Sequence, residues 1–101
     1  MHQNRVNKVL QLMAEQNIPQ MIVSDPYAVF YLTGTWIHPG ERMLVLYLTQ
    51  SGKHKLFVNE LFPFAAAVDA EKVWFNDTQD AVAILADYIE KDKTVAVDKN
   101  W

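Results

Sequence analysis

The residues best suited to ligand binding lie in one short segment, from Trp36 to Arg42. Trp36 offers a large apolar face, and Arg42 can bind a carboxylate through two parallel hydrogen bonds. His38 can donate or accept a proton near neutral pH, and Glu41 adds a carboxylate. A rigid proline and a flexible glycine between them can shape or hinge the segment. These residue types predict the rim of a binding site.

The same segment also has a purely structural interpretation. Trp36 and Ile37 could pack on the core, while Glu41 and Arg42 form a solvated ion pair of little energetic value. The residue types favour neither interpretation over the other. His38 and Glu41 could also form an acid–base pair, but no nucleophile or orienting partner stands near them in the sequence. We therefore leave both interpretations of the segment open and predict no catalytic residue in it.

Other kinds of catalytic or cofactor site have little support in the sequence. There is no cysteine, and the three histidines, His2, His38 and His54, share no i, i+4 spacing. We therefore expect no metal site, and surface positions for His2 and His54. The three glycines are too far apart to build a dinucleotide-binding or phosphate-binding loop. No G-x-S-x-G sequence presents a nucleophilic serine.

Length and charge limit the class of protein. The 101 residues suffice for one domain, and a hydrophobic content of 50% predicts a folded core. Twelve Asp and Glu against nine Lys and Arg give a formal charge of −3, which argues against nucleic-acid binding. No signal peptide is recognisable, and no apolar run reaches the roughly 20 residues of a membrane span. We expect a cytoplasmic domain that contacts neither nucleic acid nor membrane.

The segment before the predicted rim carries the signals of a short capped helix. Residues 20–24 predict a strand that is covered on both faces. Asp25 is a suitable N-cap because its side chain accepts hydrogen bonds from the first turn. Pro26 fits the first helical position, where an N–H would have no partner, and Gly34 can adopt the left-handed conformation that ends a helix. The pattern predicts a helix from Pro26 to about Thr33.

Three further helical segments are predicted. The first begins at Asn4, a candidate N-cap, and ends at Asn17, which tolerates the left-handed conformation. A short helix covers residues 60–68, with Pro63 in its first turn. Asp77 or Thr78 caps the last helix, whose apolar positions recur at helical spacing. Those apolar positions are Val82, Leu85, Ala86 and Ile89.

The remaining apolar runs predict strands. Residues 43–49 form the most apolar run, expected at the centre of the sheet, and residues 55–59 return from it as a hairpin. Shorter strands are expected at residues 73–75 and 94–98. The sum is an α/β domain with a mixed sheet of five or six strands flanked by helices. Trp101 directly after the last strand indicates a cut chain, so residues 1–101 are expected to be one domain of a longer protein.

The sequence IVSDPYAVFYLTG, followed by a polar loop containing ER and an apolar strand, resembles a known family. It is similar to the N-terminal domain of the creatinase/prolidase/aminopeptidase P family, whose fold is ribonuclease H-like. The order of the later elements, ending in VAVDKNW, extends the resemblance over essentially the whole chain. The HPGER segment looks most like the Xaa-Pro dipeptidases (prolidases), with aminopeptidase P next.

The resemblance implies a dimeric metallopeptidase that hydrolyses proline-containing dipeptides with two divalent ions, Mn²⁺ or Co²⁺. Its metal ligands belong to a C-terminal pita-bread catalytic domain that is absent from these residues. The leading domain would pair subunits and send a loop to the neighbouring active site. On that basis Trp36 is expected to form an apolar wall, and His38 and Arg42 to contact the ends of the substrate, with Glu41 beside them. The alternative is a free-standing binding or dimerisation module of the same fold.

Overall fold

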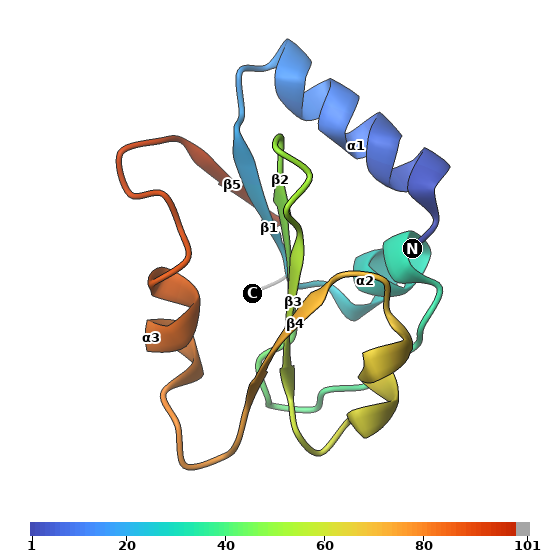
Figure 1. Ribbon diagram of the computed structural model, residues 1–101, viewed down its shortest axis with the longest axis vertical. Coiled ribbons are helices and arrows are strands. Elements are labelled where there is room, and N and C mark those ends of the chain that lie inside the picture. Colours follow the sequence, from blue (N-terminus) through green and yellow to red (C-terminus); the bar gives the residue numbers. More distant parts are fainter. Residues whose placement is uncertain (99–101) are drawn as a thin grey trace.

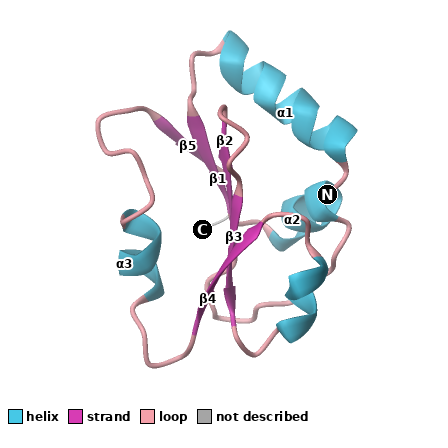
Figure 2. Cartoon of the chain, viewed as in Figure 1, coloured by secondary structure: helices cyan, strands magenta, loops and turns pink. Residues whose placement is uncertain are grey.

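The computed structural model describes residues 1–98, which form a mixed sheet with helices on both faces (Figure 1). Helices and strands alternate along most of the chain, as Figure 2 shows. In chain order they are α1 (Gln3–Glu15), β1 (Gln20–Val23), α2 (Pro26–Thr33), β2 (Val45–Thr49), β3 (Lys55–Asn59), the 3₁₀ helix η1 (Pro63–Ala67), β4 (Glu71–Phe75), α3 (Ala81–Ala86) and β5 (Val95–Val97).

The five strands lie in the order β4-β3-β2-β1-β5, so β2 is central, as predicted. β2 pairs antiparallel with both β1 and β3, and the β2–β3 pair is the predicted hairpin. β5 runs parallel to β1, and β4 runs parallel to β3. The predicted strands agree with the observed ones to within two residues at each end. The predicted mixed α/β sheet is therefore confirmed, with five strands in residues 1–98.

Apolar side chains form one core layer on each face of the sheet. One layer joins Val6 of α1 and Leu32 of α2 to the sheet residues Leu46 and Leu56. The other joins Leu85 of α3 to sheet residues that include Tyr47 and Phe57. Figure 1 shows the same division, with α1 and α2 on one side of the sheet and α3 on the other. The central strands are covered on both faces, which explains their continuous apolar sequence.

A buried glutamine connects strand β1 to the loop between α3 and β5. Gln20 of β1 is fully buried, and its amide nitrogen donates to the carbonyl oxygen of Glu90 at 2.7 Å. Its amide oxygen accepts from the Glu90 backbone nitrogen at 3.0 Å and from the hydroxyl of Tyr47. These bonds hold the loop between α3 and β5 against β1, which places β5 at the edge of the sheet.

The start of α1 differs from the prediction. Its N-cap is His2, which makes no side-chain capping bond, and Asn4 lies inside the first turn. The helix begins there because the His2 backbone nitrogen donates to the Leu32 carbonyl oxygen of α2 at 2.8 Å, a tertiary contact that no local pattern reveals. At the other end Asn17 has a φ of +58°, the left-handed conformation that was predicted for it.

Two later helices also differ from their predicted form. The segment predicted as a helix over residues 60–68 contains only a 3₁₀ helix from Pro63 to Ala67, because the side chain of Asn59 binds the Leu61 nitrogen in a turn. The cap of α3 is Asp80, which accepts from the Ala83 nitrogen at 3.1 Å. Val82, expected on the apolar face of this helix, is 68% exposed. The expectation for Trp101 concerns a residue outside the described part of the chain.

Candidate functional site

The site begins at helix α2, whose two ends match the prediction. Asp25 has an extended backbone, and its side chain accepts a hydrogen bond from the Tyr27 nitrogen at 3.2 Å. Pro26 occupies the first turn. Gly34 closes the helix with a φ of +78°, and a Cβ at this position would lie 2.8 Å from Nε2 of His2. The left-handed conformation favours glycine here, whereas the exposed side chain of His2 could move away from an added Cβ.

A second carboxylate, from the far end of the chain, also holds this helix start. Asp98 follows β5, and its side chain accepts from the backbone nitrogens of Ser24 at 2.9 Å and Asp25 at 2.8 Å. It also accepts from the hydroxyl of Ser24 at 2.8 Å. Sequence analysis missed this residue. The available signal was an aspartate at the end of a strand that must lie near β1.

The segment after Gly34 alternates between core and surface. Ile37 is 1% exposed and Pro39 is buried, whereas Trp36 is 42% exposed and His38 is exposed. The segment is therefore anchored to the core through Ile37, as the structural interpretation expected of that residue, while Trp36 and His38 face outward.

Trp36 is the centre of an exposed aromatic surface formed with α2. Its ring lies 5.1 Å from that of Tyr27 and 5.8 Å from that of Phe30, in tilted and edge-on arrangements. The ring of His38 is stacked at 6.5 Å with an interplanar angle of 20°. We call these four residues, Tyr27, Phe30, Trp36 and His38, the aromatic surface. Aromatic side chains of this kind are enriched where proteins bind one another.

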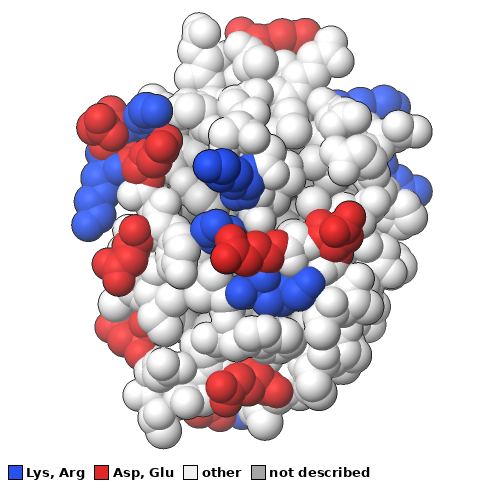
Figure 3. Space-filling model, in the orientation of Figure 1, with Lys and Arg blue, Asp and Glu red and all other residues white. Residues whose placement is uncertain are grey.

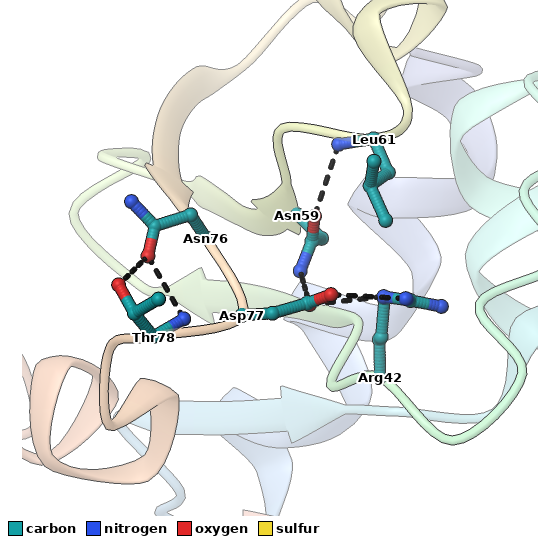
Figure 4. A network of polar contacts seen from close by, with 6 residues as sticks. All are labelled: Arg42, Asn59, Leu61, Asn76, Asp77 and Thr78. Carbon is teal, nitrogen blue, oxygen red and sulfur yellow. Dashed lines mark hydrogen bonds and ion pairs between the residues drawn. The ribbon is translucent and has the colours of Figure 1, made fainter.

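Arg42 forms an ion pair with Asp77 and not with Glu41 as the structural interpretation assumed (Figure 4). Its Nε donates to Oδ1 of Asp77 and its Nη2 donates to Oδ2, both at 3.0 Å. Asp77 also accepts a 2.7 Å hydrogen bond from Nδ2 of Asn59, which is 1% exposed. The polar residues Asn59 and Asp77 thus lie beside the predicted rim. Sequence analysis had considered Asp77, or Thr78, only as a helix cap.

These contacts shift two pKa values in opposite directions. The hydrogen bond from Arg42 holds the pKa of the Asp77 carboxyl below its ordinary value, and the hydrogen bond from Asn59 acts in the same direction. The hydrogen bond to Asp77 raises the pKa of the Arg42 guanidinium. Both groups are therefore charged at neutral pH, and the pair is a fixed feature of the physiological range.

A shallow cavity of about 350 Å³ lies between the start of α2 and the segment around Arg42. Arg42 and Glu41 are among its lining residues, and Pro26 and Pro39 give it apolar walls. The structure thus places Glu41 and Arg42 together at this cavity, and Trp36 and His38 together on the aromatic surface. The four predicted rim residues all belong to one continuous segment, but they serve two adjoining surfaces.

The described residues do not offer a metal centre. Residues 1–98 contain no group of three His, Cys, Asp or Glu side chains placed to hold an ion. His54, expected at the surface, is half-buried; its Nδ1 accepts from the Thr49 nitrogen at 3.2 Å, and burial lowers its pKa.

Charged side chains of both signs are mixed on the face of the molecule that Figure 3 shows, without a continuous basic area there. In the described part of the chain, none of the helices is both long enough and apolar enough to cross a membrane.

The sequence matches the model of one protein family over most of its length. That family is described as the Creatinase/Prolidase N-terminal domain, and the match covers residues 5–101. A comparison with curated protein sequences finds no significant relative.

Solved structures with the same fold include both isolated domains and a longer protein. The N-terminal domain of an X-Pro dipeptidase from Streptococcus pyogenes is 21% identical with a TM-score of 0.83, over 94% of this chain and 76% of that one. A proline dipeptidase from Streptococcus pneumoniae is 26% identical with a TM-score of 0.80, over 92% of this chain and 72% of that one. A prolidase from Thermococcus sibiricus is 20% identical with a TM-score of 0.88, over 100% of this chain but 29% of that one.

Proposed function

Because this chain belongs to the Creatinase/Prolidase N-terminal domain family, we propose that it is the non-catalytic N-terminal domain of a cytosolic Xaa-Pro dipeptidase. The observation that carries the proposal is the match to the Thermococcus sibiricus prolidase, in which the whole of this chain corresponds to 29% of the longer protein. The rest of that protein leaves room for a separate catalytic domain. Isolated N-terminal domains of dipeptidases with the same fold support the same division.

The proposed reaction is hydrolysis of the Xaa-Pro bond of a dipeptide in the second domain of the same protein. Two divalent ions, Mn²⁺ or Co²⁺, would lower the pKa of a bound water there and stabilise charge on the attacked carbonyl group. The residues described here do not fit such ions, because residues 1–98 contain no group of three metal-ligating side chains. We therefore assign no catalytic step to this domain.

The proposed task of this domain is to pair subunits and to complete the neighbouring active site. In a homodimer the segment from Trp36 to Arg42 would reach the active site of the partner subunit. Two observations support this role. Trp36 is 42% exposed despite its size, and the cavity beside Arg42 and Glu41 opens to solvent next to the aromatic surface. The substrate contacts would then be an apolar wall from Trp36 and polar contacts from His38, Glu41 and Arg42.

The proposal is tested by comparing this chain alone with the protein that includes the sequence after residue 101. The chain alone should not hydrolyse Ala-Pro with or without Mn²⁺, whereas the longer protein should do so when Mn²⁺ or Co²⁺ is present. Hydrolysis by the chain alone, or a reading frame that ends at Trp101, would overturn the proposal. Hydrolysis of longer peptides with proline at the second position, in preference to dipeptides, would assign the domain to an aminopeptidase P instead.

A further inference from the structure

A polar cavity of about 290 Å³ lies between the turn that joins β2 to β3 and the loop between α3 and β5. Tyr47 of β2 pairs with Lys55 of β3, and paired residues point to the same face of a sheet. This is the face that α3 covers (Figure 1). Thr49, two residues after Tyr47, also lines the cavity, and Lys93 lines it from the loop. None of the lining residues belongs to the segment from Trp36 to Arg42, so the cavity is separate from the predicted rim.

Side-chain hydrogen bonds fix both walls of this cavity. Nε2 of the buried Gln20 donates to the carbonyl oxygens of Glu90 at 2.7 Å and of Lys93 at 3.2 Å, which holds the loop. On the other wall, Nδ1 of the half-buried His54 accepts from the Thr49 backbone nitrogen at 3.2 Å, which holds the turn. The cavity is therefore formed before any ligand enters, as small-molecule sites usually are.

Positive charge is concentrated in the cavity although the whole chain has a formal charge of −3. Three of the nine Lys and Arg residues in the sequence line it, namely Lys53, Lys55 and Lys93. Among the described residues that line it, Glu90 is the only one with a carboxylate, and Glu71 contacts Lys55 from outside the lining. Even when both carboxylates are counted, the cations exceed them by one. The cavity therefore attracts anions.

Lys55 is the most firmly placed of the three lysines. Its side chain is 18% exposed, and its Nζ donates to Oε2 of Glu71 at 2.6 Å. The same Nζ lies 5.5 Å from the centre of the Tyr88 ring, within the range of a cation–π contact. An ammonium group has three donors, so the bond to Glu71 leaves two. Burial raises the pKa of the Tyr47 hydroxyl beside it, which therefore stays neutral and adds no negative charge.

The other polar groups of the cavity also have donors to offer. Among residues 1–98, Lys53 takes part in no ion pair, and Lys93 is paired with Glu90 at 3.4 Å. The hydroxyls of Thr49 and Ser51 share one hydrogen bond of 2.9 Å, which uses the proton of one and leaves the proton of the other. Donors from the turn, from β3 and from the loop thus surround one space.

From this arrangement we propose that the cavity binds the phosphate group of a small phosphorylated molecule through Lys53, Lys55 and Lys93. A phosphate monoester carries a charge of about −1.5 to −2 at neutral pH and has three accepting oxygens. Lysines that act as separate point charges suit such a group, whereas a planar carboxylate is better matched by one arginine. Pro19 and Tyr88 offer apolar surface to the rest of the molecule. The volume lies near the lower limit of small-molecule sites, roughly 300 Å³, so the ligand is small.

The test titrates this chain with AMP, with inorganic phosphate and with adenosine at constant ionic strength, and follows the backbone amide resonances by NMR. AMP and phosphate should give saturable shifts at residues 49–55 and 90–93, and adenosine should give none. Tighter binding of AMP would identify the ligand as a phosphate ester, and equal affinities would identify it as the free ion; both results support phosphate recognition. Shifts that do not saturate, that lie elsewhere, or that adenosine also produces would overturn the proposal.

Charge variants at the cavity should change the affinity for AMP in opposite directions. Lys53→Gln and Lys93→Gln, both at exposed positions, should each weaken it by about threefold to tenfold, because each removes a charged donor. Glu90→Gln should strengthen it by about threefold, because a carboxylate that competes with phosphate for Lys93 is removed. The bonds from Gln20 to the Glu90 backbone are kept in that variant.

Lys91→Gln is the matched control. Lys91 is an exposed residue of the same loop, but it does not line the cavity. This variant removes the same charge as Lys93→Gln and should leave the affinity for AMP unchanged. An equal loss in Lys91→Gln and Lys93→Gln would show that only the net charge of the loop matters, which would overturn the proposed site. Unchanged affinity in both Lys53→Gln and Lys93→Gln would overturn it as well.

Discussion

The carboxylate of Asp98 lies 2.8 Å from the backbone nitrogen of Asp25, which is 73 residues away in the sequence. Asp25 is the N-cap of α2. The side chain of Asp98 therefore holds the backbone of the residue whose own side chain caps the helix. The contact joins the edge strand β5 to the end of β1, since the Asp98 backbone nitrogen also donates to the Ile22 carbonyl oxygen. The start of α2, and with it the segment that follows, is fixed to the sheet from two sides.

This contact predicts that Asp98→Asn destabilises the domain. The amide keeps one accepting oxygen, but it loses the charge and the second accepting oxygen, to which the backbone nitrogens of Ser24 and Asp25 now both donate. We expect a loss of about 1–3 kcal/mol in the free energy of unfolding, because hydrogen bonds to a charged group are stronger than neutral ones. Thermal denaturation followed by circular dichroism measures the loss as a drop in Tm. Asp92→Asn, at an exposed loop position, is the control and should leave Tm unchanged; equal Tm values for both variants would contradict the prediction.

The observed helix caps predict different effects for residues that look equivalent in the sequence. Asp25→Ala and Asp80→Ala each remove a side chain that accepts a hydrogen bond from the first turn of a helix. Each should cost about 1 kcal/mol. Asn4→Ala should be neutral or slightly stabilising, because Asn4 lies inside α1 and alanine is the better helix former. Urea unfolding of the three variants measures the differences, and a loss for Asn4→Ala as large as for Asp25→Ala would show that Asn4 is the true cap.

Asp77 and Asn59 show why the fold could be predicted more completely than the site. The helix from Pro26 to Thr33 follows from rules that relate residues a few positions apart, and the central hairpin follows from apolar runs and a polar turn. Asp77 was considered, with Thr78, as a helix cap because its neighbours in the sequence allow it. Its actual partner, Arg42, is 35 residues away and is brought close by the pairing of β2 with β3 and of β3 with β4.

The alternation of the rim segment was hidden from sequence analysis for a similar reason. Ile37 and Pro39 are buried and Trp36 and His38 are exposed. Which of two neighbouring apolar residues faces the core depends on where the segment crosses it, and the residue types do not contain that information. Gln20 is the first residue of a strand, as predicted, but the hydrogen bond from its buried side chain to Glu90 was not predicted. Contacts between residues distant in the chain account for each of these differences.

The lowered pKa of Asp77 predicts that its contribution to stability depends on pH only in the acidic range. The hydrogen bond from Arg42 is the main cause of the shift from the ordinary value of 3.8. A carboxyl whose pKa is lower in the folded chain than in the unfolded chain stabilises the fold at any pH above the unfolded value. That stabilisation disappears as the pH falls through the folded value. The difference in free energy of unfolding between wild type and Asp77→Asn should therefore be constant between about pH 5 and pH 8 and should shrink below pH 3.8.

Urea unfolding at a series of pH values measures this difference. Asp69→Asn removes one carboxylate at an exposed position and serves as the control for the general effect of charge. Added salt should reduce the Asp77 effect at neutral pH, because the pair is partly exposed. A difference in free energy of unfolding that grows as the pH falls would mean that folding raises the pKa of Asp77 and does not lower it.

The aromatic surface predicts that Trp36 and His38 matter more for activity than for stability. In the longer protein, His38→Ala should raise KM for Ala-Pro by about threefold to tenfold, because under the proposed function it removes one polar contact to the substrate. Trp36→Ala should also raise KM, and it should cost about 1 kcal/mol of stability through the lost contacts with Tyr27 and Phe30. The matched control is Trp74→Ala, since Trp74 is an exposed tryptophan on the edge strand β4. Steady-state kinetics and Tm are measured on the same preparations. Unchanged kinetics in Trp36→Ala and His38→Ala, combined with a clear drop in Tm, would mean that the aromatic surface only packs the segment against α2.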